Sequence, residues 1–567
     1  MPQSTWPDAG NTLPPRVERP IRNPPAWILL AVLAAGAVGT LVLAAGMTFY
    51  QDTWAFLIDR QDLSADALFQ PHNEHLVVFP ALIEMALIRI FGMSSALPEY
   101  VLLTVFLVVT ALLLYVYMRR RVGQWAALVA IVIVFTLGPA WEVLLWPFEI
   151  TFIGPILFGI AMLLALERKD HLGDLAACAF LTLAVGFSGL GICFIPAAAV
   201  AILQGERRAW LRRAYVFVVP LLLYAAWWVG WGHDAESHVT LRNIVASPRF
   251  VYDSLAWSLQ SMLGLGPGYG GAPDVSWGRA LLVGAVLLLG YWLVRRRPRP
   301  NLDPGLWPIL AAALANWFLT AFNDFPGRDP SASRYQYAGV IFVLMIASNL
   351  MAGTRPGRRT LIVLAAVALL AIGPNLVTLN DGRNQLKAQS VLTRADTGAL
   401  EIAARRVDPE FQLTAAVAGT PSLINITAAE YLEAADEHGS PAYSPEELAA
   451  APEAGRRQAD IVLSRALGLY TEVQRGEAPR SAGACVSVPA GGAAGGGVPL
   501  APGATRIEVA PGPDAAISLR RFAVGEFPVK TEGVPGGSVM ILRIPRDGSS
   551  RSWRLQVSAD QAARVCR

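Results

Sequence analysis

The segment QPHNEHLVVFP, residues 70–80, places His72, Asn73, Glu74 and His75 directly before an apolar run. Imidazole and carboxylate groups exchange protons with substrates and also bind divalent cations. A further carboxylate, Asp52, lies upstream in FYQDTW, at the end of another long apolar run. These residue types predict proton transfer or ligand binding at the boundary of apolar segments.

Two later segments carry polar groups of complementary chemistry. The residues are Trp146 and Glu149 in PAWEVLLWPFEI (139–150), and Asp324, Arg328 and Arg334 in NDFPGRDPSASRYQY (323–337). Guanidinium groups bind phosphate through paired hydrogen bonds, and carboxylates and tryptophan rings are suited to sugar hydroxyls and sugar rings. We therefore expect these segments to bind a phosphorylated or hydroxylated substrate.

Some of the same groups are also candidate metal ligands. Glu74 and Glu149 carry the oxygen atoms that Mg²⁺, Mn²⁺ or Ca²⁺ prefer. His233, Asp234 and His238 form a second cluster, but their spacing does not match one face of a defined helix. A divalent cation is therefore an expected cofactor at Glu74 and Glu149, and a weaker prediction at the second cluster.

A structural role is the alternative for each of these residues. Asp52 would simply end a helix, and Asn73 would cap the helix that follows it, with Glu74 near the positive helix end. Glu149, which follows a proline, would cap the next helix, and Arg334 would anchor a helix at a membrane surface. Capping alone does not explain two histidines beside Asn73 and Glu74.

The composition indicates which elements must position these groups. Hydrophobic residues make up 54% of the 567 positions and charged residues only 16%, and the mean hydropathy is +0.43. This balance is typical of polytopic membrane proteins. The net charge of only +3 gives no support to nucleic-acid binding.

Eleven apolar runs are predicted to cross the membrane as helices. They lie near residues 26–50, 98–118, 124–141, 149–166, 172–187, 189–204, 213–231, 278–294, 306–322, 336–352 and 360–379. At about 1.5 Å rise per residue, the first run is long enough to cross a bilayer, and no cleavage site follows it. We therefore expect a transmembrane domain over residues 26–380 that retains its first helix.

Basic residues fall in every second connection, which sets the expected orientation. The clusters are Arg16, Arg19 and Arg22; Arg119–Arg121; Arg168 and Lys169; Arg207, Arg208, Arg212 and Arg213; Arg295–Arg297 and Arg299; Arg355, Arg358 and Arg359. Lys and Arg mark cytoplasmic loops. This predicts a cytoplasmic leader (1–25), outer loops at 50–97, 139–150, 232–277 and 323–336, and an extracytoplasmic C-terminal region.

The apolar run from His75 to Phe91 is not expected to cross. A crossing there would reverse the side of the arginine triplet 119–121. The run also contains Pro80, and Glu84 and Arg89 would lie in hydrocarbon. We expect a helix along the outer interface instead.

The composition changes after about residue 380. Residues 381–480 have helical patterns, and Ser444 followed by Glu447 matches a capping box. Residues 481–567 alternate as strands in TRIEVA, SVMILRI and SWRLQVS, which predicts a β-sandwich or jelly-roll module. Cys485 and Cys566 bracket this module and are expected to form a disulfide, whereas Cys178 and Cys193 lie in predicted spans.

QDTW, QPHNEHLVVFP and WPFEI, in this order after a first span, resemble the GT-C superfamily of membrane glycosyltransferases, and bacterial glycosyltransferase-like membrane proteins in particular. The likeness covers roughly the first 350 residues. It implies a polyprenyl-phosphate-sugar donor in the bacterial plasma membrane, an inverting transfer and Asp52 as the general base. The chain has a single Asp at this position, where many relatives carry an acidic pair.

The resemblance also implies roles for the remaining polar residues. Arg328 and Arg334 would hold the lipid-linked phosphate, and the other substrate-binding residues would be His72, Asn73, Glu74, His75, Trp146, Glu149 and Asp324. The acceptor would be an extracytoplasmic glycan of the cell envelope, a lipid or a protein.

Two other functions are compatible with the sequence. A transporter or flippase for lipid-linked sugars needs many spans, but it is expected to carry ionisable groups near the bilayer midplane. A non-catalytic scaffold would use the C-terminal module to bind glycans. Replacement of Asp52 separates these functions, because only a transferase would lose turnover.

Overall fold

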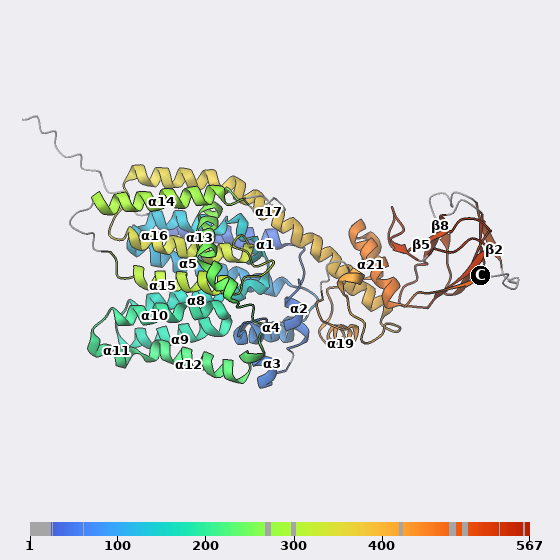
Figure 1. The fold of residues 1–567 in the computed structure, drawn as a ribbon, viewed down its shortest axis with the longest axis horizontal. Coiled ribbons are helices and arrows are strands. Elements are labelled where there is room, and N and C mark those ends of the chain that lie inside the picture. The colour runs from blue at the N-terminus through green and yellow to red at the C-terminus, as the bar shows by residue number, and fades with distance from the viewer. Residues whose placement is uncertain are drawn as a thin grey trace, which may run out of the picture.

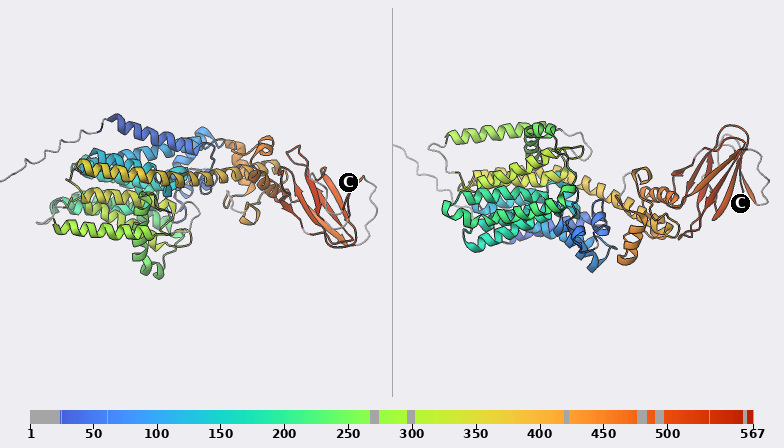
Figure 2. Two further views of the ribbon diagram at one scale, coloured as in Figure 1. Left: turned by 90° about the horizontal axis from the view of Figure 1, so that it is seen from above. Right: turned by 60° about the horizontal axis from the view of Figure 1, so that its bottom comes forward.

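The computed structural model describes residues 24, 26–60, 62–266, 274–295, 302–418, 423–475, 484–489, 497–531, 533–558 and 562–566. A bundle of roughly parallel helices lies at one end and β-sheets lie at the other, and a long helix, α17, runs between them (Figures 1 and 2). The leader with its three arginines, and Arg296, Arg297 and Arg299, lie outside the described residues.

Each of the eleven predicted apolar runs forms a helix. These are α1 (Ala26–Ala44), α5 (Leu97–Val122), α6 (Gln124–Phe135), α8 (Ile150–Leu166), α9 (His171–Phe187), α10 (Phe194–Leu203), α12 (Tyr215–Gly230), α14 (Ser276–Arg295), α15 (Leu306–Phe322), α16 (Ser333–Leu350) and α17 (Arg358–Ala403). Among the described residues, six helices are long and apolar enough to cross a membrane, or seven if one bent pair is a single span. The structure is mostly helical with several apolar helices, and the count of eleven spans is not confirmed.

Further helices lie between those of the apolar runs. They are α2 (Thr53–Ile58), α3 (Ala65–Phe69), α4 (Val78–Phe91), η1 (Gly138–Ala140), α7 (Trp141–Leu145), η2 (Pro147–Glu149), η3 (Gly189–Cys193), α11 (Arg207–Arg213), η4 (Gly232–Asp234) and α13 (Leu241–Met262). The predicted loop 232–277 thus contains a 22-residue helix, α13, which packs on α14, α15 and α16. The arginine-rich α11 lies at the end of the bundle opposite to the C-terminal region (Figure 1).

Helix α4 is the run that was not expected to cross. It begins at Val78 and packs against α2, α5 and α9, with Pro80 in its first turn. Glu84 is 2% exposed and lies against protein, near Glu99 of α5. Protein therefore covers the face of α4 that carries this carboxyl group.

The chain bends by 55° between α6 and the η1–α7 pair. At the bend, the Gly138 backbone N–H donates to Asn375 Oδ1 of α17 at 3.2 Å. A side chain at Gly138 would meet the carbonyl oxygen of Asn375 at 2.0 Å, so this close approach requires glycine. The chain therefore changes direction just before the segment that carries Glu142, Trp146 and Glu149.

Helix α17 continues for 46 residues into the C-terminal region, so the predicted domain boundary at residue 380 falls inside one helix. The smaller helices α18 (Ala415–Ala418), α19 (Ala428–His438), α20 (Pro445–Ala450) and α21 (Glu453–Ala466) follow. The capping box of Ser444 and Glu447 is present at the start of α20. This region contacts the first outer loop, since Trp54 packs edge-on against Tyr431 and the Met93 N–H donates to the His438 carbonyl.

Among the described residues, nine strands form two antiparallel sheets at the C-terminal end. They are β1 (Tyr470–Arg475), β2 (Cys485–Val488), β3 (Val498–Pro499), β4 (Gly503–Val509), β5 (Ala516–Arg520), β6 (Val529–Lys530), β7 (Ser538–Ile544), β8 (Arg554–Ser558) and β9 (Ala563–Cys566). The orders are β1-β7-β4-β9-β2 and β3-β8-β5-β6. The β region thus begins at Tyr470, earlier than predicted, and the strands predicted in TRIEVA, SVMILRI and SWRLQVS are confirmed as β4, β7 and β8.

Covalent and polar contacts hold the β region together and join it to α21. Cys485 and Cys566 face each other on β2 and β9 and form the predicted disulfide. The Asp460 carboxylate of α21 accepts hydrogen bonds from the backbone N–H groups of Arg521 and Ala523 at 2.8 and 3.0 Å, and from that of Phe522 at 2.8 Å. Three backbone donors to one buried carboxylate fix the sheets against this helix.

Candidate active site

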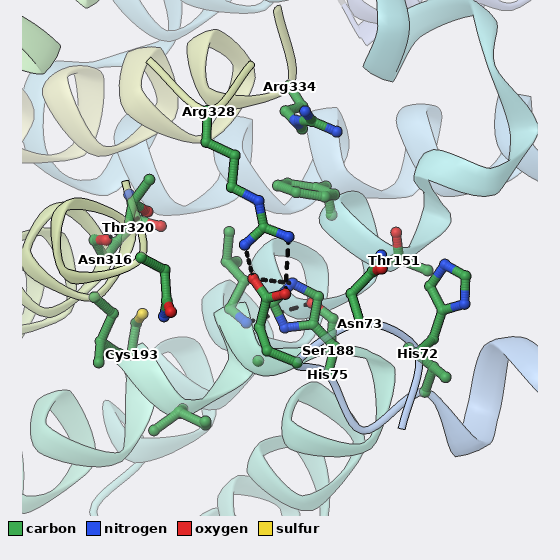
Figure 3. Close-up of a pocket in the computed structure, with 18 of the residues that line it drawn as sticks. His72, Asn73, His75, Thr151, Ser188, Cys193, Asn316, Thr320, Arg328 and Arg334 are labelled. Atoms are coloured by element: carbon green, nitrogen blue, oxygen red, sulfur yellow. Dashed lines mark hydrogen bonds and ion pairs between the residues drawn. The ribbon is translucent and has the colours of Figure 1, made fainter. Parts of the chain in front are cut away.

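A cavity of about 240 Å³ lies where the loops that were predicted to face outward meet the ends of the helices. Its wall contains Asp52, the 72–75 segment, Trp146, Glu149, Arg328 and Arg334, together with residues of α12, α15 and η3. Figure 3 shows Arg328 pointing into the centre of this cavity. Segments that are up to 282 positions apart in sequence, from Asp52 to Arg334, therefore share one cavity.

The HNEH motif is a tight turn. The backbone N–H of His72 donates to the His75 carbonyl at 3.0 Å, and that of His75 donates to the His72 carbonyl at 2.9 Å. Asn73 has φ of 52°, a left-handed conformation that Asn tolerates better than most residues. The N-cap residue of α4 is Val77, without a side-chain cap, so the interpretation of Asn73 as a helix cap is wrong.

Two neighbouring residues hold this turn in place. The buried Arg60 donates to the carbonyl oxygens of Gln70 at 3.0 Å and Pro71 at 3.3 Å, which fixes the chain directly before His72. A side chain at Gly189 would lie 2.6 Å from Nδ1 of His75, so glycine allows the imidazole to pack on η3. The sequence contains no local signal for either contact.

Glu74 and Arg328 form an ion pair in the middle of the cavity (Figure 3). Both terminal nitrogens of Arg328 donate to the carboxylate, Nη1 to Oε1 and Nη2 to Oε2, the second at 2.8 Å. Burial raises the pKa of Glu74, but the hydrogen bonds and the charge of Arg328 outweigh burial and hold this pKa below its usual value, with a further contribution from His75 only when it is protonated. Glu74 is therefore an anion whose charge is already neutralised.

His75 lies beside this ion pair, with Nε2 3.5 Å from Oε1 of Glu74. Burial, supported by the positive charge of Arg328, lowers the pKa of His75 to about 4 even though Glu74 opposes the shift. The imidazole is therefore neutral near pH 7 and acts as a hydrogen-bonding group in the cavity wall.

Asp52 lies at the start of α2, but its side chain does not cap this helix. One carboxylate oxygen is 3.6 Å from Nε2 of His72, and about a third of the Asp52 side chain is exposed. The His72 ring packs edge-on against Phe56 and Phe148, which fixes its orientation. Asp52 thus presents a carboxylate to the cavity, as a general base must.

Glu149 is the N-cap residue of α8 by position, yet its carboxylate makes no capping hydrogen bond. Glu149 is 1% exposed, and its Oε2 atom has no hydrogen-bond partner among the described residues. The capping interpretation is therefore wrong for this side chain as well. Asp52 and Glu149 both line the cavity, so an acidic pair is present that the sequence motif alone did not indicate.

Arg334, at the start of α16, is the second guanidinium group in the cavity wall. It donates to the Gly327 carbonyl at 3.1 Å, and Nε has no partner among the described residues. No carboxylate oxygen of the described chain forms an ion pair with its guanidinium within 4 Å, although its backbone N–H hydrogen-bonds the Glu142 carboxylate. The negative charges of Glu142, Glu149 and Asp52 also act on it. Unlike Arg328, Arg334 keeps donors available for a ligand.

Trp146 forms part of an aromatic wall. Its indole N–H donates to Thr53 Oγ1 at 3.2 Å, and its ring contacts those of Tyr50 and Phe148. Asp324 does not line the cavity, and its backbone carbonyl accepts a hydrogen bond from the side-chain amide of Asn243. The structure therefore brings together every predicted site residue except Asp324.

Glu74 and Glu149, the predicted metal ligands, both line the cavity. Arg328 occupies both carboxylate oxygens of Glu74. His233 contacts Asp234 and His238 contacts Glu236, as separate exposed pairs. The described part of the chain contains no group of three or more His, Cys, Asp or Glu residues that is arranged to hold a metal ion.

Sequence reasoning missed two groups of residues near the cavity. Glu142 contributes negative charge near Arg334, and its backbone N–H donates to Ser333 at 3.1 Å. Asn316 and Thr320 line the opposite side of the cavity from within an apolar helix. These two polar residues are four positions apart, on one face of an otherwise apolar helix. This spacing is the sequence pattern that could have identified them as cavity residues.

No known family pattern matches this chain, and no curated protein matches it. Among solved structures, the chain is similar to the crystal structure of ArnT from Cupriavidus metallidurans bound to undecaprenyl phosphate. The TM-score is 0.42 and the sequence identity is 14%, over 74% of this chain and 86% of that chain. Function is therefore inferred from the chemistry of the cavity.

Proposed function

We propose that this chain is a membrane glycosyltransferase of the GT-C type. It transfers a sugar from a polyprenyl-phosphate donor to a hydroxyl group of an acceptor on the outer side of the membrane. The observation that carries this proposal is that Asp52, Glu149 and the unpaired guanidinium of Arg334 line one cavity at the end of an apolar helical bundle. A base and a phosphate-binding cation are the two groups that this transfer requires.

The proposed reaction proceeds by direct displacement. The acceptor oxygen attacks the anomeric carbon of the donor sugar while Asp52 accepts the hydroxyl proton. The bond from this carbon to the phosphate oxygen breaks, and the phosphate leaves with the bonding electron pair. Attack opposite the leaving group inverts the anomeric configuration.

Arg334 is proposed to bind the departing phosphate. Its charge and free donors stabilise the negative charge that develops as the bond breaks. Arg328 is proposed to hold the 72–75 turn in place through its ion pair with Glu74. His72, whose Nε2 lies 3.6 Å from an Asp52 carboxylate oxygen, is proposed to orient that carboxylate. Trp146 and Glu149 offer an aromatic face and a hydrogen-bond acceptor to the sugar.

The proposed membrane orientation follows from the positions of the arginines. Helix α11, which carries four of them, lies at the bundle end away from the cavity and the β-sheets (Figure 1). With this end in the cytoplasm, the cavity and the C-terminal region face the outside of a bacterial plasma membrane. The acceptor is then an extracytoplasmic molecule, for which we propose a cell-envelope glycan.

Replacement of Asp52 with Asn tests this function. The purified full chain in lipid vesicles is given a panel of polyprenyl-phosphate hexoses and pentoses with envelope glycan fractions, and released polyprenyl phosphate is measured. We expect D52N to reduce turnover by about 10²- to 10⁴-fold, the usual contribution of a general base.

Asp62 provides a matched control, because it lies in the same outer loop and is exposed. D62N is expected to keep the wild-type rate. Unchanged turnover in D52N, or no release from any donor by the wild-type chain, would contradict the proposal.

A further inference from the structure

The Glu74–Arg328 ion pair divides the cavity into two parts. Figure 3 shows His72, Thr151 and Arg334 on one side of Arg328, and Asn316, Thr320 and Cys193 on the other. The first part contains the carboxylates Asp52 and Glu149. We call the second part, which contains Cys193, Asn316 and Thr320, the neutral arm.

The neutral arm is built mainly from one face of α15. Asn316, Thr320 and Asn323 are separated by four and three residues, the spacing of side chains on one side of a helix. The rest of this helix, LWPILAAALANWFLTAF, is almost entirely apolar. The polar residues therefore face the cavity in an otherwise lipid-compatible helix.

Asn316 points to a ligand because its amide is not used by the protein. The residue is 7% exposed, and its side chain makes no hydrogen bond within the described part of the chain. Neither amide atom is among the side-chain atoms that the described protein seals off without a partner, so the amide stays accessible from the cavity. Thr320 donates its hydroxyl hydrogen to the backbone carbonyl of Asn316 at 2.8 Å. The Thr320 hydroxyl oxygen can therefore still accept a hydrogen bond from a ligand.

The chemistry of this arm fits neutral hydroxyl groups. The cavity wall within the described residues has two guanidinium groups, Arg328 and Arg334, and Glu74 already neutralises the first. A phosphate in the neutral arm would find no unpaired cation. An amide, in contrast, donates and accepts at once, which matches two adjacent hydroxyls of a sugar ring.

We propose that Asn316 and Thr320 form a subsite that recognises the hydroxyl groups of a sugar. The subsite deepens the proposed function, since it determines which sugar is accepted while Arg334 binds phosphate in the other part of the cavity. The sugar belongs either to the donor lipid or to the acceptor glycan. A ring that lacks one of the recognised hydroxyls leaves the amide unpaired and binds more weakly.

Isosteric replacements test this subsite in the full chain in vesicles. In N316L and T320V the polar groups are lost with little change in volume, and a leucine is compatible with the apolar surroundings of α15. The measurements are KM for each sugar substrate and its deoxy analogues, and Kd for polyprenyl phosphate without a sugar. T182V is the matched control, because Thr182 makes the same hydroxyl bond to the carbonyl four residues earlier, at 2.9 Å, but lies in α9 away from the cavity.

We expect N316L to raise KM for the sugar substrate about 10- to 100-fold and to reduce discrimination against one deoxy analogue. Kd for polyprenyl phosphate and all values for T182V should stay within twofold of wild type. A change in donor KM alone assigns the subsite to the donor sugar, and a change in acceptor KM alone assigns it to the acceptor. The proposal would be overturned if N316L weakened binding of sugar-free polyprenyl phosphate as much as it raised KM for the sugar substrate. It would also be overturned if KM and the discrimination against deoxy analogues were unchanged.

The two proposals fail in different ways. If wild type turns over donor but N316L has wild-type sugar selectivity, the subsite is refuted and the transferase stands. If no turnover is found with wild type, direct binding of polyprenyl-phosphate sugars still reports on the subsite. Weaker binding of the sugar-bearing lipid by N316L, with unchanged binding of the sugar-free lipid, then supports the subsite without the reaction.

Discussion

Arg328 and Glu74, which lie 254 positions apart in sequence, form a two-pronged ion pair in which both terminal nitrogens of the guanidinium meet the carboxylate. The pair joins the first outer loop to the connection between α15 and α16. Both side chains are about 15% exposed, so neither charge is fully solvated. The pair therefore holds two distant loops at one fixed separation across the cavity.

Removal of one partner should destabilise the protein more than removal of both. R328Q leaves the Glu74 carboxylate buried without a cation, and we expect a loss of about 2–3 kcal/mol, whereas E74Q/R328Q should recover at least half of it. Thermal unfolding of the four chains in the cycle measures the coupling. Strictly additive losses would show that the two side chains do not interact.

The outer loop should lose stability on acidification. Since burial lowers the pKa of His75 to about 4, the unfolded chain binds a proton at this residue below about pH 6.5 that the folded chain does not. Stability therefore falls as the pH drops from about 6.5 to 4, by about 3 kcal/mol. Glu74, with its lowered pKa, adds a loss of the same sign at still lower pH.

Thermal unfolding of H75Q measures this effect. The variant should lose most of the change between pH 6.5 and 4 and keep the change below pH 4. H233Q is the control, because His233 is exposed on the outer side. An H75Q curve that is parallel to wild type over the whole range would show that His75 does not contribute.

Arg334 should contribute to phosphate affinity through geometry as well as charge. R334Q is expected to raise Kd for polyprenyl phosphate about 10- to 100-fold, the contribution of a charge-assisted hydrogen bond, and R334K should restore only part of it. Equilibrium binding to the sugar-free lipid gives both values. The control is R242Q, at an exposed arginine on α13 outside the cavity, which should bind like wild type. Wild-type affinity in R334Q would show that Arg334 does not bind the phosphate.

Chelation should leave turnover unchanged. The oxygens of Glu74 are held by Arg328, and the expected ligand cluster does not form among the described residues. Preincubation with EDTA is therefore expected to keep the transfer rate within twofold of the untreated protein. A large loss that added Mg²⁺, Mn²⁺ or Ca²⁺ reverses would contradict this expectation.

The helical runs and several cavity residues were predictable because they depend on local patterns. An apolar run of about 20 residues is typical of a membrane-spanning helix, and Asp52 and Arg334 stand near the ends of such runs. The partner of Glu74 was not predictable, since Arg328 reaches it only through the packing of the bundle. Asp324 shares a loop with Arg328, and sequence proximity alone does not show that its side chain lies outside the cavity.

The two incorrect capping interpretations have a common cause. Asn73 and Glu149 both stand where a cap residue is expected, and sequence patterns cannot show in which direction a side chain points. Asn73 instead adopts a left-handed turn conformation, and Glu149 lines the cavity without a capping hydrogen bond. In both cases a polar residue is better explained by the cavity than by the adjacent helix.

Helix α17 has 46 residues without interruption, which at about 1.5 Å per residue gives a rod of roughly 70 Å. The hydrocarbon layer of a bilayer is only about 30 Å thick, so more than half of this rod projects beyond it. A continuous helix, unlike a flexible linker, keeps the C-terminal region at a constant distance from the membrane surface. Whatever the terminal sheets hold is consequently presented at one distance from the lipid surface.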